Sequence, residues 1–142
     1  MGSHVADRVL ALVRDRNVGG VANPRVLILG ATFKENCPDT RNSRVVDVIR
    51  AFTGQSCSVV IADPWVSSEE RVDIESASWL DFHDLLGIDV GNPVGTFDAV
   101  VVAVSHREFL EIGERLRSAL TPNGILFDVK GLLPRHAVDG RL

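Results

Sequence analysis

The hydrophobic residues of this chain form short continuous runs that alternate with helical repeats. Four runs, at 25–30, 57–62, 97–104 and 125–129, are apolar at both odd and even positions. Runs this short and this uniformly apolar are typical of central parallel strands that are buried on both faces. A weaker segment, 72–77, predicts a short additional strand.

Three segments, one before the first run and two between runs, predict helices that pack on the sheet. In 44–53 and 105–120 the apolar residues recur every three or four positions, as on the buried face of a helix, and 5–13 is close to this spacing. Capping-box patterns at 67–70 and 105–108 predict helix starts. Residues 81–87 predict a short helical turn, and 132–142 predict a loosely ordered tail. The repeating apolar positions are Val45, Val48, Ile49 and Phe52, then Phe109, Ile112, Leu116 and Leu120.

Alternating strands and helices predict a three-layer, Rossmann-like α/β fold with a mainly parallel five-stranded sheet. We expect the order 3-2-1-4-5 with right-handed crossovers. In that order the topological switch point lies between the strands at 25–30 and 97–104. Ligands of such sheets bind at the carboxyl ends of the strands beside the switch point.

The polar segment 31–43 follows the first predicted strand and is a candidate anion-binding loop. It lacks the Gly-x-Gly-x-x-Gly pattern that lets a pyrophosphate approach the backbone, so a principal NAD site is not expected here. Lys34 and Arg41 instead offer a point charge and a bidentate fork to a phosphate. Lys130, after the last predicted strand, is expected at the same edge of the sheet.

Composition limits the partners that this loop can serve. The chain has 142 residues, of which 45% are hydrophobic, and a net charge of -4, which fits one globular domain without a nucleic-acid or membrane partner. No apolar run is long enough to span a bilayer. The two cysteines, Cys37 and Cys57, make no disulfide framework or metal-ligand spacing, so we expect a cytoplasmic protein without a metal.

Two motifs carry a family resemblance. Residues 32–43, Thr-Phe-Lys-Glu-Asn-Cys-Pro-Asp-Thr-Arg-Asn-Ser, and the later Asp63-Pro-Trp resemble the C-terminal UDP-binding domain of the UDP-glucose/GDP-mannose dehydrogenase family. The Asn-Cys-Pro-Asp wording is similar to the UDP-N-acetylhexosamine 6-dehydrogenase branch. The resemblance implies a UDP-sugar-binding domain at 23–136, with a helical lead-in at 5–22, an expression-tag remnant at 1–4 and a tail at 137–142.

The resemblance implies part of an NAD-dependent enzyme that oxidises the C6 hydroxyl of a UDP-sugar to a carboxylate, giving uronic acids for surface polysaccharides. Phe33, Lys34 and Lys130 would contact the UDP-sugar, and Arg41 would reach towards NAD. Lys130 stands where the family often has an arginine, so the charge is kept but the fork is lost. The nucleophilic cysteine and the main NAD site would lie in a missing N-terminal domain. A missing central domain would form a homodimer.

Each assignment has a structural alternative. Lys34 could be a solvated lysine, Arg41 could brace the loop through Asp39, and Phe33 could pack rather than bind. Cys37 is not expected to be a nucleophile, because no histidine is placed to activate it.

Other polar residues are expected to have structural roles. We expect His106 at the surface, and we expect Asp63 and Trp65 to shape the turn after the second strand. Asp128 could orient the loop after the last strand.

Two other functions remain open at this point. A free-standing nucleotide-binding module that regulates a partner would share the same fold. A receiver-like phosphoacceptor domain would place a hydroxyl at Ser105 and a lysine at Lys130. It would also need an acidic pair after the first strand, where this chain has Leu29-Gly-Ala.

Overall fold

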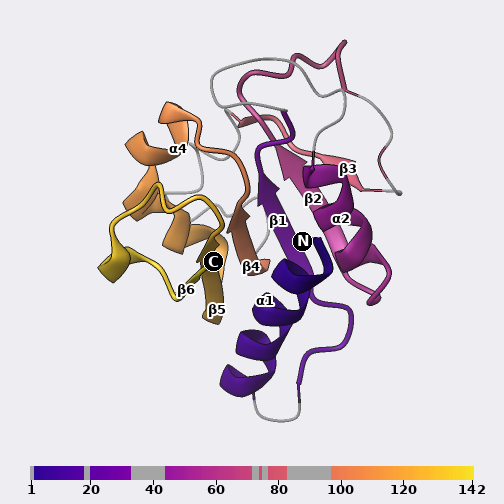
Figure 1. The fold of residues 1–142 in the computed structure, drawn as a ribbon, viewed down its shortest axis with the longest axis vertical. Coiled ribbons are helices and arrows are strands. Elements are labelled where there is room, and N and C mark those ends of the chain that lie inside the picture. Colours follow the sequence, from indigo (N-terminus) through magenta and orange to yellow (C-terminus); the bar gives the residue numbers. More distant parts are fainter. Residues whose placement is uncertain (1, 18–19, 33–43, 72–73, 75–76, 83–96) are drawn as a thin grey trace.

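A computed structural model describes residues 2–17, 20–32, 44–71, 74, 77–82 and 97–142. Their centre is a six-stranded, all-parallel sheet in the order β3-β2-β1-β4-β5-β6. The predicted order of the first five strands is confirmed, and a sixth strand is added at the edge (Figure 1). The strands are β1 (Arg25–Leu29), β2 (Ser58–Ala62), β3 (Ser78–Trp79), β4 (Phe97–Val102), β5 (Leu120–Asp128) and β6 (Gly140–Arg141).

The central strand β1 shows why these apolar runs form strands. Its neighbours β2 and β4 pair with it in parallel on both sides. Val26 and Ile28 belong to one hydrophobic core, and Leu27 and Leu29 belong to a second core on the other face. All four side chains are fully buried, so both faces of the strand must be apolar.

Helices cover both faces of this sheet. Helices α1 (Gly2–Arg16) and α2 (Val45–Thr53) pack on the core that contains Val26, and their contact with each other is extensive (Figure 1). The predicted buried face of α2 is confirmed. On the other face lie α4 (Arg107–Glu111) and the 3-10 helix η2 (Gly113–Ala119). The result is the predicted three-layer arrangement.

The helix predicted over 105–120 is wrong in its length and in its capping box. Residue His106, not Ser105, precedes the first turn, and α4 ends after five residues. Gly113 then begins η2 and lies against Leu133, where an added Cβ would be 3.0 Å from the leucine Cδ2. The glycine weakens the helix and admits the close packing, so the segment tightens into 3-10 geometry.

The connections after β2 also differ from the prediction. The third strand of the described residues is β3 at 78–79, whereas the strand predicted at 72–77 lies mostly outside the described residues, and Ile74 and Ala77 within it belong to no strand. Residues 67–70 form a turn rather than a helix start. The capping-box bond itself does form, because the Ser67 N–H donates to Glu70 Oε1 at 3.1 Å. Of the turn predicted at 81–87, only the first two residues belong to the described residues.

The loosely ordered tail predicted for 132–142 is wrong. The tail contains the short 3-10 helix η3 (Arg135–Ala137) and then β6, which pairs with β5. Asp139 holds it in place by accepting bonds from Arg16, Arg117 and the Leu126 N–H, each at 2.8 Å. These contacts are polar and join residues that are distant in sequence, so the hydrophobic pattern could not predict them.

Within the residues that the structure describes, no helix is both long and apolar enough to cross a lipid bilayer.

Candidate functional site

The carboxyl ends of β1 and β2 are joined by the buried carboxylate of Asp63. Its Oδ2 accepts the Ala31 N–H at 2.7 Å, and its Oδ1 accepts the Trp65 N–H at 2.8 Å. Ala31 follows β1, whereas Asp63 and Trp65 follow β2. The predicted role of Asp63 and Trp65 in this turn is confirmed. The same carboxylate also fixes where the chain leaves β1.

His106 adds the carboxyl end of β4 to this arrangement. Its Nε2 lies 3.0 Å from Asp63 Oδ2 and 3.0 Å from Thr32 Oγ1. A carboxylate only accepts, so Nε2 donates to Asp63, and the Thr32 hydroxyl oxygen lies close enough to share that donor. All three side chains are at most 4% exposed. We call Asp63, His106 and Thr32 the switch-point cluster.

The surface position predicted for His106 is wrong, because aromatic rings enclose it. The ring centroids of Phe109 and Trp65 lie 5.4 and 6.1 Å from that of His106. The Trp65 indole N–H donates to Glu108 Oε1 at 3.1 Å, which ties the β2 turn to α4. A polar side chain buried in this way needs partners, and the switch-point cluster supplies them.

Gly30 lets β1 and β4 approach closely beside this cluster. Its φ of +100° is a left-handed conformation, and an added Cβ would lie 2.6 Å from the Val104 Cβ. The Ala103 and Val104 N–H groups both point to the Leu29 carbonyl, at 2.9 and 3.4 Å. Glycine at this position therefore satisfies both the backbone conformation and the packing.

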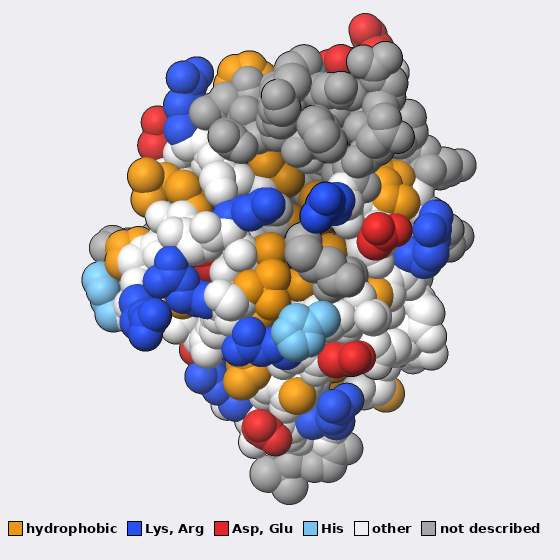
Figure 2. All heavy atoms as spheres, viewed as in Figure 1, with side chains coloured by type: hydrophobic (Ala, Val, Ile, Leu, Met, Phe, Trp, Pro, Cys, Tyr) orange, Lys and Arg blue, Asp and Glu red, His pale blue; other side chains and the backbone are white. Residues whose placement is uncertain are grey.

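A second buried carboxylate shapes the loop after β5. Asp128 is fully buried and accepts the N–H groups of Gly131 at 3.0 Å and Leu133 at 2.7 Å. The predicted role of Asp128 in orienting this loop is confirmed. Lys130, between these contacts, is exposed at the carboxyl edge of the sheet, where the sequence predicted it. In Figure 2, Lys and Arg side chains are spread over the described part of the drawn face rather than gathered in one patch.

Only part of the predicted binding set can be located. Phe33, Lys34 and Arg41 lie outside the described residues, and Cys37 does too. Thr32, which the sequence interpretation did not single out, directly precedes Phe33 and belongs to the switch-point cluster. The sequence feature that could have predicted this cluster is the position of its members: each follows a predicted strand, and the carboxyl ends of parallel strands meet at one edge of the sheet.

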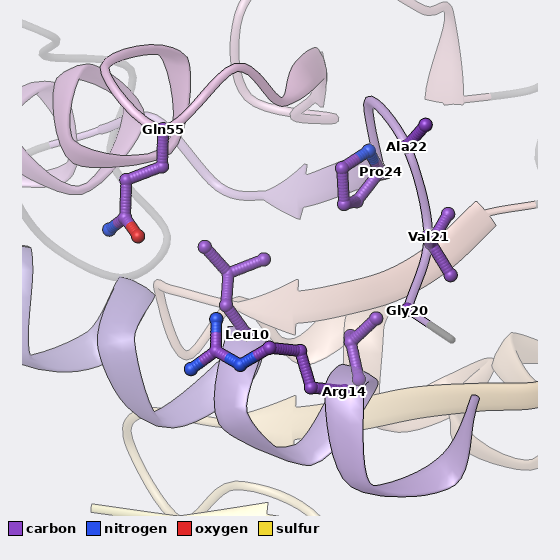
Figure 3. Close-up of a pocket in the computed structure, with 8 residues that line it drawn as sticks. Leu10, Arg14, Gly20, Val21, Ala22, Pro24 and Gln55 are labelled. Atoms are coloured by element: carbon purple, nitrogen blue, oxygen red, sulfur yellow. The ribbon is translucent and has the colours of Figure 1, made fainter. Parts of the chain in front are cut away.

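Two hollows flank the sheet at opposite ends. One of about 400 Å³ lies beside the switch-point cluster and is lined by Asp63, Arg71, Asp81 and Glu108, among others. The other, of about 370 Å³, lies at the amino end of β1, between α1 and the chain that enters β1 (Figure 3). Arg14 and Gln55 line the second hollow, so it is remote from the carboxyl edge that binds ligands in this kind of fold.

Neither a metal-binding cluster nor a reactive thiol is found among the described residues. No group of three His, Cys, Asp or Glu side chains in the described ranges is placed to hold a metal ion. Cys57 is a free, buried thiol, and burial, with a smaller effect of Asp98, raises its pKa. A raised pKa keeps the thiol protonated and poorly nucleophilic.

A doubly wound parallel sheet with polar residues at its switch point belongs to the class of α/β domains that bind ligands, nucleotides among them, at the carboxyl edge. Residues 27–135 match the UDP-glucose/GDP-mannose dehydrogenase family, UDP binding domain. The chain therefore belongs to this family of dehydrogenases, and the match decides against the receiver-like alternative.

Curated relatives support the same assignment. The chain is 36% identical to a UDP-N-acetyl-D-glucosamine 6-dehydrogenase of Pseudomonas aeruginosa and 37% identical to one of Salmonella typhi. Both alignments cover 100% of the chain but only 32% and 31% of the relatives. The chain thus spans about a third of the length of the curated relatives that it matches.

Solved structures share the fold. A UDP-D-ManNAc dehydrogenase of Pyrococcus horikoshii superposes with a TM-score of 0.66 at 18% identity, over 98% of this chain and 30% of that one. The UDP-N-acetyl-mannosamine dehydrogenase Cap5O of Staphylococcus aureus gives 0.65 at 18% identity, over 99% and 29%.

Proposed function

We propose that this chain supplies the nucleotide-sugar-binding part of an NAD-dependent UDP-sugar 6-dehydrogenase. In this proposal the enzyme oxidises the sugar C6 hydroxyl to a carboxylate and so forms a uronic acid for surface polysaccharide. The observation that carries it is the family match over 27–135, which extends over the switch-point cluster and Lys130. The two 6-dehydrogenases of similar sequence favour an N-acetylated hexosamine as the sugar.

The proposed binding groups meet at the carboxyl edge of the sheet. Lys130, with Phe33 and Lys34 from the loop after β1, contacts the UDP-sugar, and the two lysines offer charge to its diphosphate. Arg41 reaches towards NAD. Among the described residues, Asp63 and His106 have a positioning role in this proposal: they fix Thr32, from which the loop begins.

The reactive groups of the proposed enzyme lie elsewhere. NAD, when bound, accepts the hydride, and both its main site and the nucleophilic cysteine belong to an N-terminal domain. A central domain completes a homodimeric, cytoplasmic enzyme. This chain contributes no catalytic residue, and its part is to bind and orient the UDP-sugar.

The binding proposal is tested on the chain itself. We expect 15N-labelled protein to show saturable amide shifts with millimolar UDP, concentrated after β1 and β5. We also expect no NADH from UDP-N-acetylglucosamine, UDP-N-acetylgalactosamine or UDP-glucose in the presence of NAD. Turnover of any of these by the chain alone would contradict the division of roles, and an absence of shifts would reject UDP binding.

Lys34 is tested in the intact enzyme. Lys34→Ala removes one charge-assisted hydrogen bond and should weaken substrate binding by about 1 to 3 kcal/mol. The measurement is the Michaelis constant for the UDP-sugar. An unchanged constant would remove Lys34 from the site.

A further inference from the structure

The tail brings an arginine to the edge where Lys130 lies. Strand β6 runs parallel to β5, and Arg141 is in register with Asp128. Lys130 follows Asp128 by two residues, so Arg141 and Lys130 both lie at the carboxyl end of this strand pair. Neither the position nor the role of Arg141 could be predicted from a tail that showed no strand pattern.

The Arg141 guanidinium rests against the backbone of Gly131, the residue after Lys130. Gly131 has a φ of +71°, and a Cβ added there would collide with Arg141 Nη2. A glycine at this position therefore satisfies the turn and also leaves room for the guanidinium. The backbone carbonyl of Arg141 accepts a bond from Arg8, so the residue is anchored without use of its charge.

The charge of Arg141 is not neutralised by the carboxylates around it in the described part of the chain. Asp128, its neighbour in register, directs both oxygens to backbone N–H groups. Asp139, two residues earlier, forms ion pairs with Arg16 and Arg117, each at 2.8 Å. No ion pair between the Arg141 guanidinium and a carboxylate is found among the described residues.

Arg141 is also within reach of a ligand. It is half-buried, and with Arg135 and Asp139 it lines an open hollow of about 310 Å³ formed by the tail. A guanidinium that lies beside solvent, and whose donors no carboxylate of the described residues uses, is suited to bind a phosphate with two parallel hydrogen bonds. A lysine ammonium cannot provide that geometry.

We infer that Arg141 and Lys130 together bind the diphosphate of the nucleotide, with Arg141 supplying the bidentate contact that Lys130 lacks. This inference rests on the proposed function and names a further binding residue for the same site. The Asp128 bonds fix the loop that carries Lys130, and the pairing of β6 with β5 fixes Arg141 beside it.

The test is UDP binding to the chain, followed by NMR, with four proteins. Arg141→Gln removes the charge and keeps a similar length, and Arg141→Lys keeps the charge without the fork. Arg14→Gln is the matched control, because Arg14 is an exposed arginine at the opposite end of the sheet (Figure 3). We expect the dissociation constant for UDP to rise about tenfold in Arg141→Gln, the loss expected for one charged contact. The dissociation constant of Arg141→Lys should lie between these two values, and that of Arg14→Gln should equal the value of the unsubstituted chain.

Uridine, which has no phosphate, serves to distinguish the contribution of the diphosphate to binding from that of the nucleoside. Uridine affinity should be the same in all four proteins. Equal UDP affinity in Arg141→Gln and the unsubstituted chain would overturn the inference while leaving UDP binding intact. An equal loss in Arg14→Gln, or an equal loss for uridine, would overturn it too, because either would show a general effect. If the unsubstituted chain does not bind UDP, the proposed function fails first, and the inference fails with it.

Discussion

Removal of the Asp63 carboxylate should destabilise the domain strongly, although the side chain is small and polar. In Asp63→Ala, the N–H groups of Ala31 and Trp65 and the ring N–H of His106 all lose their acceptor. Each buried donor left unsatisfied costs about 1 to 3 kcal/mol. The three share one carboxylate and can relax together, so we expect a loss near the lower end of the summed cost, about 3 to 5 kcal/mol. That is a large part of the roughly 5 to 15 kcal/mol available to a domain.

The measurement is urea-induced unfolding at neutral pH, with tryptophan fluorescence as the signal. Asp63→Asn keeps the shape and one acceptor, and should lose only about 1 to 3 kcal/mol. Asp47→Ala is the control, because Asp47 is 67% exposed and lies 3.8 Å from Arg50 in a surface pair that contributes at most about 1 kcal/mol. If Asp63→Ala lost less than about 1 kcal/mol, the carboxylate would not be what joins the three strand ends.

Two further substitutions test the fold around the site. Gly30→Ala should cost about 1 to 3 kcal/mol more than Gly20→Ala, because both glycines have positive φ but only Gly30 faces a close contact, with Val104; equal losses in thermal unfolding would refute this. Burial alone would raise the pKa of Asp139, but the hydrogen bond from Arg117 and two weaker donors lower it below 3.8. Its contribution to stability is therefore present above the unfolded-state pKa and lost as the pH falls through the folded-state pKa. Asp139→Asn should flatten the acid dependence of the urea midpoint, and an unchanged dependence would contradict the assignment.

The sequence predicted the elements that hydrophobic burial determines. The run at 25–30 became β1 because both of its faces are covered, and the buried face of α2 follows its apolar spacing. The predicted sheet order followed from the alternation of these elements, and it is confirmed. These features depend on side chains whose burial is favoured wherever the chain places them.

The features that the sequence did not predict depend on polar contacts between distant segments. Strand β6 has only two residues and is held by Asp139, whose partner Arg16 is 123 residues away in sequence. His106 is buried because Asp63 and Thr32 come from two other strand ends. A periodic pattern cannot show which histidine will find such partners, because the pairing is decided only when the strands meet.

The anion site that we propose at the carboxyl edge of the sheet belongs to a chain with a net charge of -4. Asp63 and Asp128 follow or end parallel strands and direct their oxygens to backbone N–H groups: Asp63 to Ala31 after β1 and to Trp65 after β2, and Asp128 to the loop after β5. A carboxylate occupied in this way is less available to pair with a neighbouring lysine or arginine. The same acidic residues therefore hold the loops in place and, in the proposed site, leave Lys130 and Arg141 to attract an anion. Neutral replacements of Asp63 or Asp128 should loosen this edge of the sheet. Neutral replacements of Lys130 or Arg141 should instead weaken ligand binding and leave the fold unchanged.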